Sequence, residues 1–131
     1  MGLSAKMKIL IVDDISSMRK IIKNMLMEIG FKNIHEAEDG EDAWKKIYDA
    51  KSIGEEFQFI LCDYIMSGMT GLDLYKNMQS DDKLRTTHFM VITAESEQDI
   101  ILAVAKAGIK NIIVKPLSAQ LLKEKIAVMF N

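Results

Sequence analysis

The chain has 131 residues, of which 49% are hydrophobic and 27% charged, with one proline and one cysteine. This length suits a single core that buries roughly two-thirds of the surface of the unfolded chain, and it leaves no room for a second domain. The lone cysteine excludes an internal disulfide and a zinc site, and a formal net charge of −2 lacks the basic excess of nucleic-acid-binding proteins, so we expect no nucleic-acid partner.

The first residues, 1–6, are too few and too polar for a signal peptide. We expect them to be a disordered leader or a cloning remnant, with one domain over residues 7–131. No stretch approaches the roughly 18 apolar residues of a membrane span, so we expect no membrane insertion and a cytoplasmic protein.

The apolar run at residues 8–12 predicts a strand buried on both faces, as in a parallel sheet, and it ends at Asp13 and Asp14. Ser16 or Ser17 then offers an N-cap. Apolar residues recur at steps of three and four up to Ile29, where Gly30 supplies a C-terminal stop, so this segment is predicted to be an amphipathic helix.

The middle of the chain repeats this order. A weaker strand at residues 33–37 is followed by a predicted turn at Asp39-Gly40 and a helix through residues 43–48. Residues 57–62 form the third predicted strand, which ends on Asp63. A loop with two glycines then leads to a helix near residues 72–78.

The last part of the chain contains two more such pairs. A strand at residues 88–92 closes at Thr93-Ala94, and a helix follows at 97–106. A fifth strand at residues 111–114 stops at Lys115-Pro116, and Ser118 caps a final helix that runs to about residue 130.

Five strand–helix pairs with short connections predict a doubly wound α/β fold, (βα)5, with a five-stranded parallel sheet and right-handed crossovers. In such sheets, chemistry is expected at the carboxyl ends of the strands. Five polar residues follow those ends: Asp13, Asp14, Asp63, Thr93 and Lys115.

Carboxylates that converge repel one another unless they are protonated or bridged by a cation, and oxygen-only ligands suit Mg²⁺. A threonine hydroxyl and a lysine ammonium in the same pocket suit phosphoryl oxygens, and a carboxylate in line with a phosphoryl group is a plausible nucleophile. One aspartate after a strand is more often a turn or capping residue. The joint occurrence at four strand ends instead indicates phosphoryl transfer onto an aspartate.

The same residues carry a resemblance. The chain over residues 7–131 resembles the receiver domain of bacterial response regulators in its motifs at 9–14 (Ile-Leu-Ile-Val-Asp-Asp), 91–94 (Val-Ile-Thr-Ala) and 114–116 (Val-Lys-Pro). Within the family it is most similar to the stand-alone chemotaxis regulators, at 17–19, 30–33 and 36–40. The resemblance implies a flavodoxin-like sheet of strand order 2-1-3-4-5, and a monomeric signalling switch that catalyses its own phosphorylation and dephosphorylation rather than an ordinary enzyme.

By position, the resemblance implies that Asp63 accepts a phosphoryl group from a histidine kinase of the chemotaxis type. Asp14, Asp63 and the main-chain carbonyl of Ile65 would ligate Mg²⁺, and Asp13 would hold a metal-bound water. The resemblance also gives roles to three residues of the later strand ends: Thr93 and Lys115 would bind phosphoryl oxygens, and the bond before Pro116 would be cis.

Three positions depart from the family pattern. Ile112 stands where an aromatic switch residue is usual, and Met66-Ser67 replaces a Met-Pro pair. Ile65 replaces an asparagine that is common in chemotaxis members, and an apolar side chain there cannot orient an attacking water, so we hypothesise slow self-dephosphorylation. Glu95 and Pro116 complete the expected set of switch and tuning residues, together with Ile65 and Ile112.

The expected partner is the flagellar motor switch protein, or another target, bound through the face made by the helix at 97–106, the strand at 111–114 and the last helix. Lys125 matches a basic position of that face, whereas Glu97, Gln98 and Asp99 depart from the usual lysines. Two alternatives remain: a receiver of a non-chemotaxis pathway with transcriptional or second-messenger output, and an aspartyl-phosphate phosphohydrolase.

Overall fold

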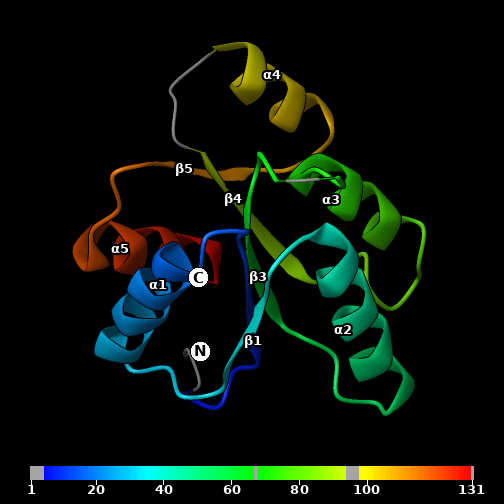
Figure 1. The fold of residues 1–131 in the computed structure, drawn as a ribbon, viewed down its shortest axis with the longest axis horizontal. Coiled ribbons are helices and arrows are strands. Elements are labelled where there is room, and N and C mark those ends of the chain that lie inside the picture. The colour runs from blue at the N-terminus through cyan, green and yellow to red at the C-terminus, as the bar shows by residue number, and fades with distance from the viewer. Residues whose placement is uncertain (1–4, 67, 94–97, 131) are drawn as a thin grey trace.

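The computed structural model describes residues 5–66, 68–93 and 98–130, and within them five strands alternate with five helices (Figure 1). The strands are β1 (Ile9–Val12), β2 (Ile34–Ala37), β3 (Phe59–Asp63), β4 (His88–Thr93) and β5 (Asn111–Val114). The helices are α1 (Ser16–Ile29), α2 (Gly40–Ser52), α3 (Gly71–Gln79), α4 (Gln98–Lys106) and α5 (Ala119–Met129). The predicted (βα)5 order is confirmed.

The five strands form one parallel sheet in the order β2-β1-β3-β4-β5, which confirms the predicted order 2-1-3-4-5. In the register, Val12 of β1 pairs with Cys62 of β3, and Thr93 of β4 pairs with Val114 of β5. The strands therefore end nearly level with one another, and the residues that follow β1 and β5 lie at the same edge of the sheet as the last residues of β3 and β4.

Alternating side chains divide the core into two layers. Ile9 and Ile11 of β1 belong to the core beneath α1 and α5, whereas Leu10 and Val12 belong to the core beneath α2, α3 and α4. Figure 1 shows the corresponding helices on opposite sides of the sheet. Strand β1 and residues 59–62 of β3 are apolar throughout, as the sequence pattern predicts for strands covered on both faces.

Three local expectations were wrong. Helix α1 has Ile15 rather than Ser16 or Ser17 as its N-cap, without a capping side chain, because the Ile15 amide already donates to Asp13 Oδ1 at 2.9 Å and starts the turn there. Asp39 is the N-cap of α2 rather than part of a turn, and its Oδ1 accepts from the amide of Asp42 at 2.7 Å. Strand β3 begins at Phe59, two residues after the predicted start at residue 57.

The expected ends of two helices are confirmed. Gly30 closes α1 with a φ of 126°, a left-handed conformation that favours glycine. Ser118 caps α5 by accepting from the amide of Leu121 at 3.0 Å.

Ala5 and Lys6 lie in a turn, where the oxygen of Ala5 accepts from the amide of Lys32 at 3.1 Å. In the described residues, every helix is too short or too polar to cross a bilayer.

Candidate functional site

Three carboxylates meet at the carboxyl ends of β1 and β3. Asp13 and Asp14 follow β1 and Asp63 is the last residue of β3, and each contributes one oxygen to a group whose members lie within 4.8 Å of one another. The parallel register of β1 and β3 produces this approach. Asp13 and Asp63 are buried, whereas Asp14 is exposed, so the group is open to solvent on the side of Asp14.

Asp13 is fixed by two hydrogen bonds, but one of its carboxylate oxygens has no hydrogen-bond partner among the described residues. Its amide donates to the oxygen of Ala37 at 3.2 Å, and its Oδ1 accepts from the amide of Ile15 at 2.9 Å. Its Oδ2 is buried without a hydrogen-bond partner among the described residues. A buried oxygen is normally hydrogen-bonded, so this one fits a site completed by a cation or by a water bound to it.

Lys115 supplies the positive charge of the site. Its Nζ lies 3.5 Å from Oδ2 of Asp63 and 3.8 Å from Oδ2 of Asp13. The amide of Lys115 donates to the main-chain oxygen of Thr93 at 2.7 Å, which ties the ends of β5 and β4 together. The peptide bond between Lys115 and Pro116 is cis, as the family resemblance implied.

The two buried carboxylates have raised pKa values. Burial is the main cause for both, and the nearby charge of Asp13 also raises the pKa of Asp63. Lys115 and main-chain amides oppose the shift: the Ile15 amide lowers the pKa of Asp13, and the Ile65 amide lowers that of Asp63. Both carboxyl groups therefore hold a proton more tightly than free carboxyl groups do, and three carboxylate oxygens within 4.8 Å are a donor set that fits a hard divalent cation such as Mg²⁺.

The remaining predicted residues lie around this group. Thr93 is buried at the end of β4, one strand away from Asp63. Ile112 on β5 is half-buried and packs against the core beneath α2, α3 and α4. Glu95 lies outside the described residues, as does Ser67.

After Asp63, the side chain of Ile65 faces solvent and that of Met66 faces the core. The side chain of Ile65 is 64% exposed, while Met66 is buried in the core. The amide of Ile65 is a hydrogen-bond donor to the Asp63 carboxylate. Ile65 therefore contributes its main chain to the acidic group and leaves an apolar side chain in solvent beside it.

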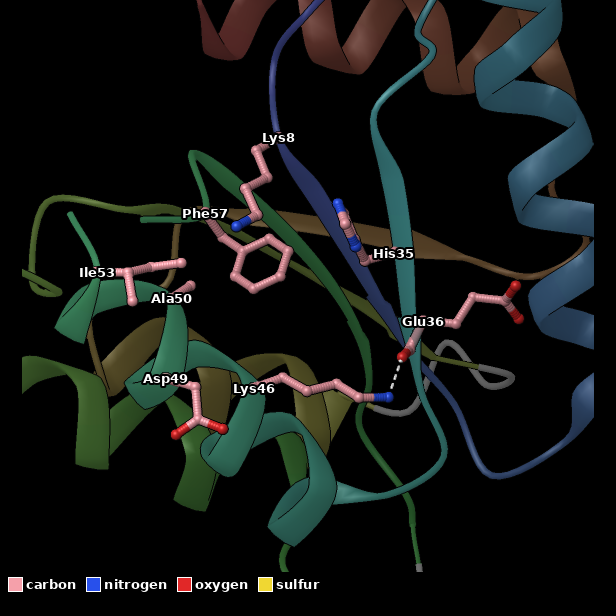
Figure 2. Close-up of a pocket in the computed structure, with 8 residues that line it drawn as sticks. All are labelled: Lys8, His35, Glu36, Lys46, Asp49, Ala50, Ile53 and Phe57. Atoms are coloured by element: carbon pink, nitrogen blue, oxygen red, sulfur yellow. Dashed lines mark hydrogen bonds between the residues drawn. The ribbon is translucent and has the colours of Figure 1, made fainter. Parts of the chain in front are cut away.

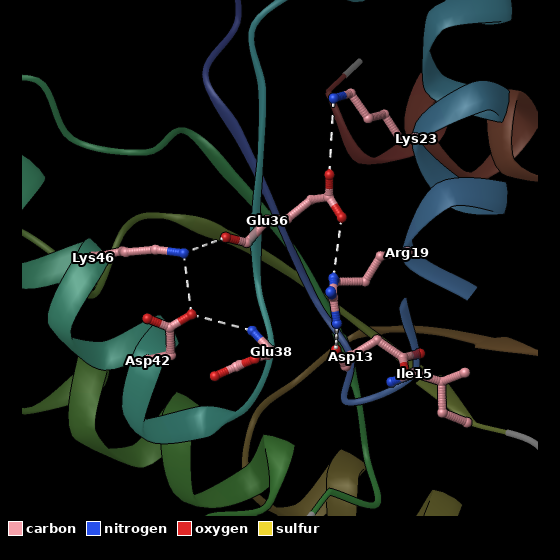
Figure 3. Close-up of polar contacts among 8 residues, drawn as sticks. All are labelled: Asp13, Ile15, Arg19, Lys23, Glu36, Glu38, Asp42 and Lys46. Carbon is pink, nitrogen blue, oxygen red and sulfur yellow. Dashed lines mark hydrogen bonds and ion pairs between the residues drawn. The ribbon is translucent and has the colours of Figure 1, made fainter. Parts of the chain in front are cut away.

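Two supporting residues were not expected from the sequence. Arg19 donates from Nη1 to the main-chain oxygen of Asp13 at 2.7 Å (Figure 3). In the sequence, Arg19 stands out only as part of the motif at residues 17–19. A Cβ atom on Gly71 would lie 2.8 Å from the main-chain oxygen of Asp63. Neither contact has a sequence signal beyond an arginine after the acidic pair and a glycine after β3.

A separate cavity of about 410 Å³ lies between α2, β2 and the residues just before β1 and β3 (Figure 2). It has an aromatic wall and three basic groups, and its lining includes Lys8, His35, Lys46 and Phe57. Burial and the surrounding lysines lower the pKa of His35. None of the clustered carboxylates lines this cavity, so it is distinct from the acidic site.

Comparisons with known proteins point to one family. A family model described as the response regulator receiver domain matches residues 9–127. The chain is 44% identical to the chemotaxis protein CheY of Pseudomonas aeruginosa, over 95% of this chain and 96% of that protein. It is 43% identical to the chemotaxis protein CheY-3 of Vibrio cholerae, over 98% of this chain and 95% of that protein.

Solved structures of proteins from the same family have the same fold as this chain. The chemotaxis protein CheY4 of Vibrio cholerae superposes with a TM-score of 0.83 at 25% identity, covering 95% of this chain and 98% of that one. A chain from the CheX-CheY-BeF3-Mg²⁺ complex of Borrelia burgdorferi also has a TM-score of 0.83, at 26% identity, and the match covers 95% of this chain and 89% of that one.

Proposed function

Because this chain belongs to the response regulator receiver family, we propose that its domain, residues 7–131, accepts a phosphoryl group on Asp63 from a histidine kinase of the chemotaxis type. The observation that carries the proposal is the approach of three carboxylates within 4.8 Å, with the Lys115 ammonium 3.5 Å from Asp63. An acidic group of this kind combines a nucleophile with the ligands of a cation, and the Lys115 ammonium can bind the oxygens of an anionic substrate.

Mg²⁺ is the expected cofactor. Asp14, Asp63 and the carbonyl of Ile65 would hold it, and Asp13 would hold one of its waters. The buried Oδ2 of Asp13, which lacks a hydrogen bond among the described residues, supports this donor set, and so does the structural relative from the CheX-CheY-BeF3-Mg²⁺ complex of Borrelia burgdorferi. When bound, Mg²⁺ neutralises charge on the carboxylates and on the incoming phosphoryl oxygens.

In the transfer, an oxygen of the ionised Asp63 carboxylate forms a bond to phosphorus. The bond between phosphorus and the imidazole nitrogen of the kinase phosphohistidine breaks, and its electron pair stays on that nitrogen. Lys115 and Thr93 bind the equatorial oxygens, where negative charge accumulates. Burial of Asp63 excludes most of the competing water from the nucleophile.

The new phosphoryl group then biases the conformation of the domain. Thr93 and Lys115 are linked through their main chains at 2.7 Å, so a shift of either one is passed to both β4 and β5. The output surface would be the face formed by α4, β5 and α5. It exposes Leu102 on α4 and Val128 on α5, which are 54% and 76% exposed, and Lys125 on α5.

We propose the flagellar motor switch protein as the partner of this face, because the curated relatives are named as chemotaxis proteins. The protein would act as a cytoplasmic monomer. Ile112, Glu95, Ile65 and Pro116 would tune the switch. With Ile112 in place of an aromatic ring, the conformational readout would depend more on the segment after Thr93.

A phosphorylation assay with acetyl phosphate and Mg²⁺ tests this function. We expect one phosphoryl group per chain, none in Asp63→Asn, and a gain in affinity for a motor-switch peptide only in the phosphorylated wild type. Repeated turnover of a small phosphate ester would instead support a phosphohydrolase. Phosphorylation without any gain for the peptide would favour a receiver of another pathway.

A further inference from the structure

We infer that Arg19 is a positioning residue for the carboxylate group, because its guanidinium holds the peptide that joins Asp13 to Asp14. The inference rests on the proposed Mg²⁺ site and adds a determinant of its geometry. Arg19 lies on α1, outside the set of residues that contribute oxygens to the group.

The guanidinium is held from both sides. Its Nη1 donates to the main-chain oxygen of Asp13 at 2.7 Å, and its Nε donates to Oε1 of Glu36 on β2 at 3.0 Å (Figure 3). The Arg19 side chain is only 16% exposed. On the other side of Glu36, Lys23 Nζ lies 3.8 Å from Oε2. Charge-assisted bonds of this length are among the stronger ones in proteins, so the arginine bridges α1, β2 and the end of β1.

This bridge completes the fixation of Asp13. The amide of Asp13 is bonded to Ala37, its Oδ1 to the Ile15 amide and its main-chain oxygen to Arg19. Only Oδ2 then lacks a hydrogen bond. Three bonds around one residue leave little freedom of rotation, so Oδ2 is directed at the site, where the Lys115 ammonium lies 3.8 Å away. Since the oxygen bonded by Arg19 belongs to the 13–14 peptide, the same contact also orients Asp14.

Positioning and charge predict effects of opposite sign. Arg19 is a cation next to an acidic group, so by Coulomb's law alone its removal would strengthen the binding of Mg²⁺. If the guanidinium instead fixes the direction of the carboxylates, its removal weakens binding. Residues that orient metal ligands typically change metal affinity by about 10-fold to 100-fold. The sign of the change therefore separates the two roles.

The first test compares Arg19→Met with Lys20→Met, which removes a neighbouring exposed cation of the same helix. Titration calorimetry with MgCl₂ should give a dissociation constant about tenfold higher for Arg19→Met, and no weakening for Lys20→Met. The ¹⁵N shift of the Asp14 amide should also move in Arg19→Met without Mg²⁺, because that amide belongs to the peptide that Arg19 holds. Equal or tighter binding by Arg19→Met would overturn the inference.

A second pair covers the case in which Arg19→Met does not fold. Glu36→Ala and Glu36→Gln remove the same charge, but the glutamine oxygen can still accept from Arg19 Nε. We expect Mg²⁺ to bind more weakly to Glu36→Ala than to Glu36→Gln, and equal affinities would contradict the positioning role. Failure of the wild type itself to bind Mg²⁺ would instead refute the proposed function, which keeps the two failures distinct.

Discussion

Gly71, the first residue of α3, lies directly against the main chain of Asp63. A Cβ atom at Gly71 would stand 2.8 Å from the Asp63 oxygen and 3.3 Å from Cys62 Sγ. The Gly71 amide also donates to the oxygen of Tyr64 at 3.1 Å. The absence of a side chain at Gly71 thus lets α3 start immediately beneath the proposed phosphoacceptor.

We therefore expect Gly71→Ala to destabilise the domain by about 1–3 kcal/mol and to weaken Mg²⁺ binding, since the backbone of Asp63 must move. Gly40→Ala is a matched control, because Gly40 is also the first residue of a helix, but its Cβ would meet Met69 at 2.6 Å rather than Asp63. Urea unfolding and MgCl₂ titration of both variants check this. If the two variants lost Mg²⁺ affinity equally, Gly71 would have no particular link to the site.

Neutralising one carboxylate should stabilise the protein in the absence of Mg²⁺. Burial raises the pKa of Asp63 in the folded state, so the folded state holds this proton more tightly than the unfolded state does. Stability then falls as the pH rises through the acidic range. We expect Asp63→Asn in EDTA at pH 7 to be more stable than the wild type by about 1 kcal/mol, or roughly 4 °C in Tm.

The difference between Asp63→Asn and the wild type should shrink as the pH falls through the raised pKa of Asp63, because the wild-type carboxyl then takes up its proton. Thermal unfolding across this pH range measures it, with the exposed Asp49→Asn as the control. Added Mg²⁺ should reverse the order by stabilising the wild type more. A variant less stable than the wild type at pH 7 in EDTA would be inconsistent with a cluster in need of a cation.

The exposed side chain of Ile65 should determine the lifetime of the phosphorylated state. An apolar side chain next to Asp63 cannot orient a water for attack on phosphorus, whereas an asparagine amide can. We expect phosphorylated Ile65→Asn to lose its phosphoryl group several-fold faster than the wild type. Ile65→Leu, which is also apolar, should decay at the wild-type rate. Equal decay rates for Ile65→Asn and the wild type would end this hypothesis.

An ion pair far from the site should make stability depend on pH. Lys51 Nζ lies 2.6 Å from Oδ2 of Asp81, and this hydrogen bond lowers the pKa of Asp81 and raises that of Lys51. A lowered carboxyl pKa contributes stability above the unfolded pKa, which is lost as the pH falls through the folded one. Asp81→Asn should thus be less stable than the wild type at pH 7, and the difference should disappear once the pH has fallen below the lowered pKa of Asp81.

Unfolding by urea at several pH values measures the effect of Asp81→Asn, and Asp82→Asn is the comparison for a more exposed ion pair, because Asp82 pairs with Arg85 while its side chain is 91% exposed. High salt should reduce the loss caused by Asp81→Asn, since the pair lies near the surface. A loss that persists unchanged into the acid range would mean that the carboxylate charge is not its cause.

The sheet and the three carboxylates were predictable from the sequence for a simple reason. The buried runs at β1 and β3 are apolar to their last residues and then change abruptly to Asp13 and Asp63, and parallel strands bring such ends to one edge. The periodicity of α1 was equally clear, because its apolar residues recur at steps of three and four. These features depend on local pattern and on general rules of topology.

What escaped prediction depends on contacts between distant segments or on short hydrogen bonds. Arg19 reaches Asp13 only because α1 returns along β1, and Gly71 meets Asp63 only because α3 starts beneath β3. The N-cap of α1 was misplaced because the Asp13 carboxylate, rather than a serine, takes the Ile15 amide. None of these contacts produces a periodic pattern of residues from which it could be predicted.

Asp63 is the proposed phosphoacceptor. Reduction with borohydride converts an acyl phosphate to an alcohol and so marks the modified residue for peptide mass spectrometry. After treatment with acetyl phosphate and Mg²⁺, we predict a reduced side chain at Asp63 alone, and no reduced residue when EDTA replaces Mg²⁺. Reduction at Asp13 or Asp14 instead, or at no aspartate in the presence of Mg²⁺, would contradict the account.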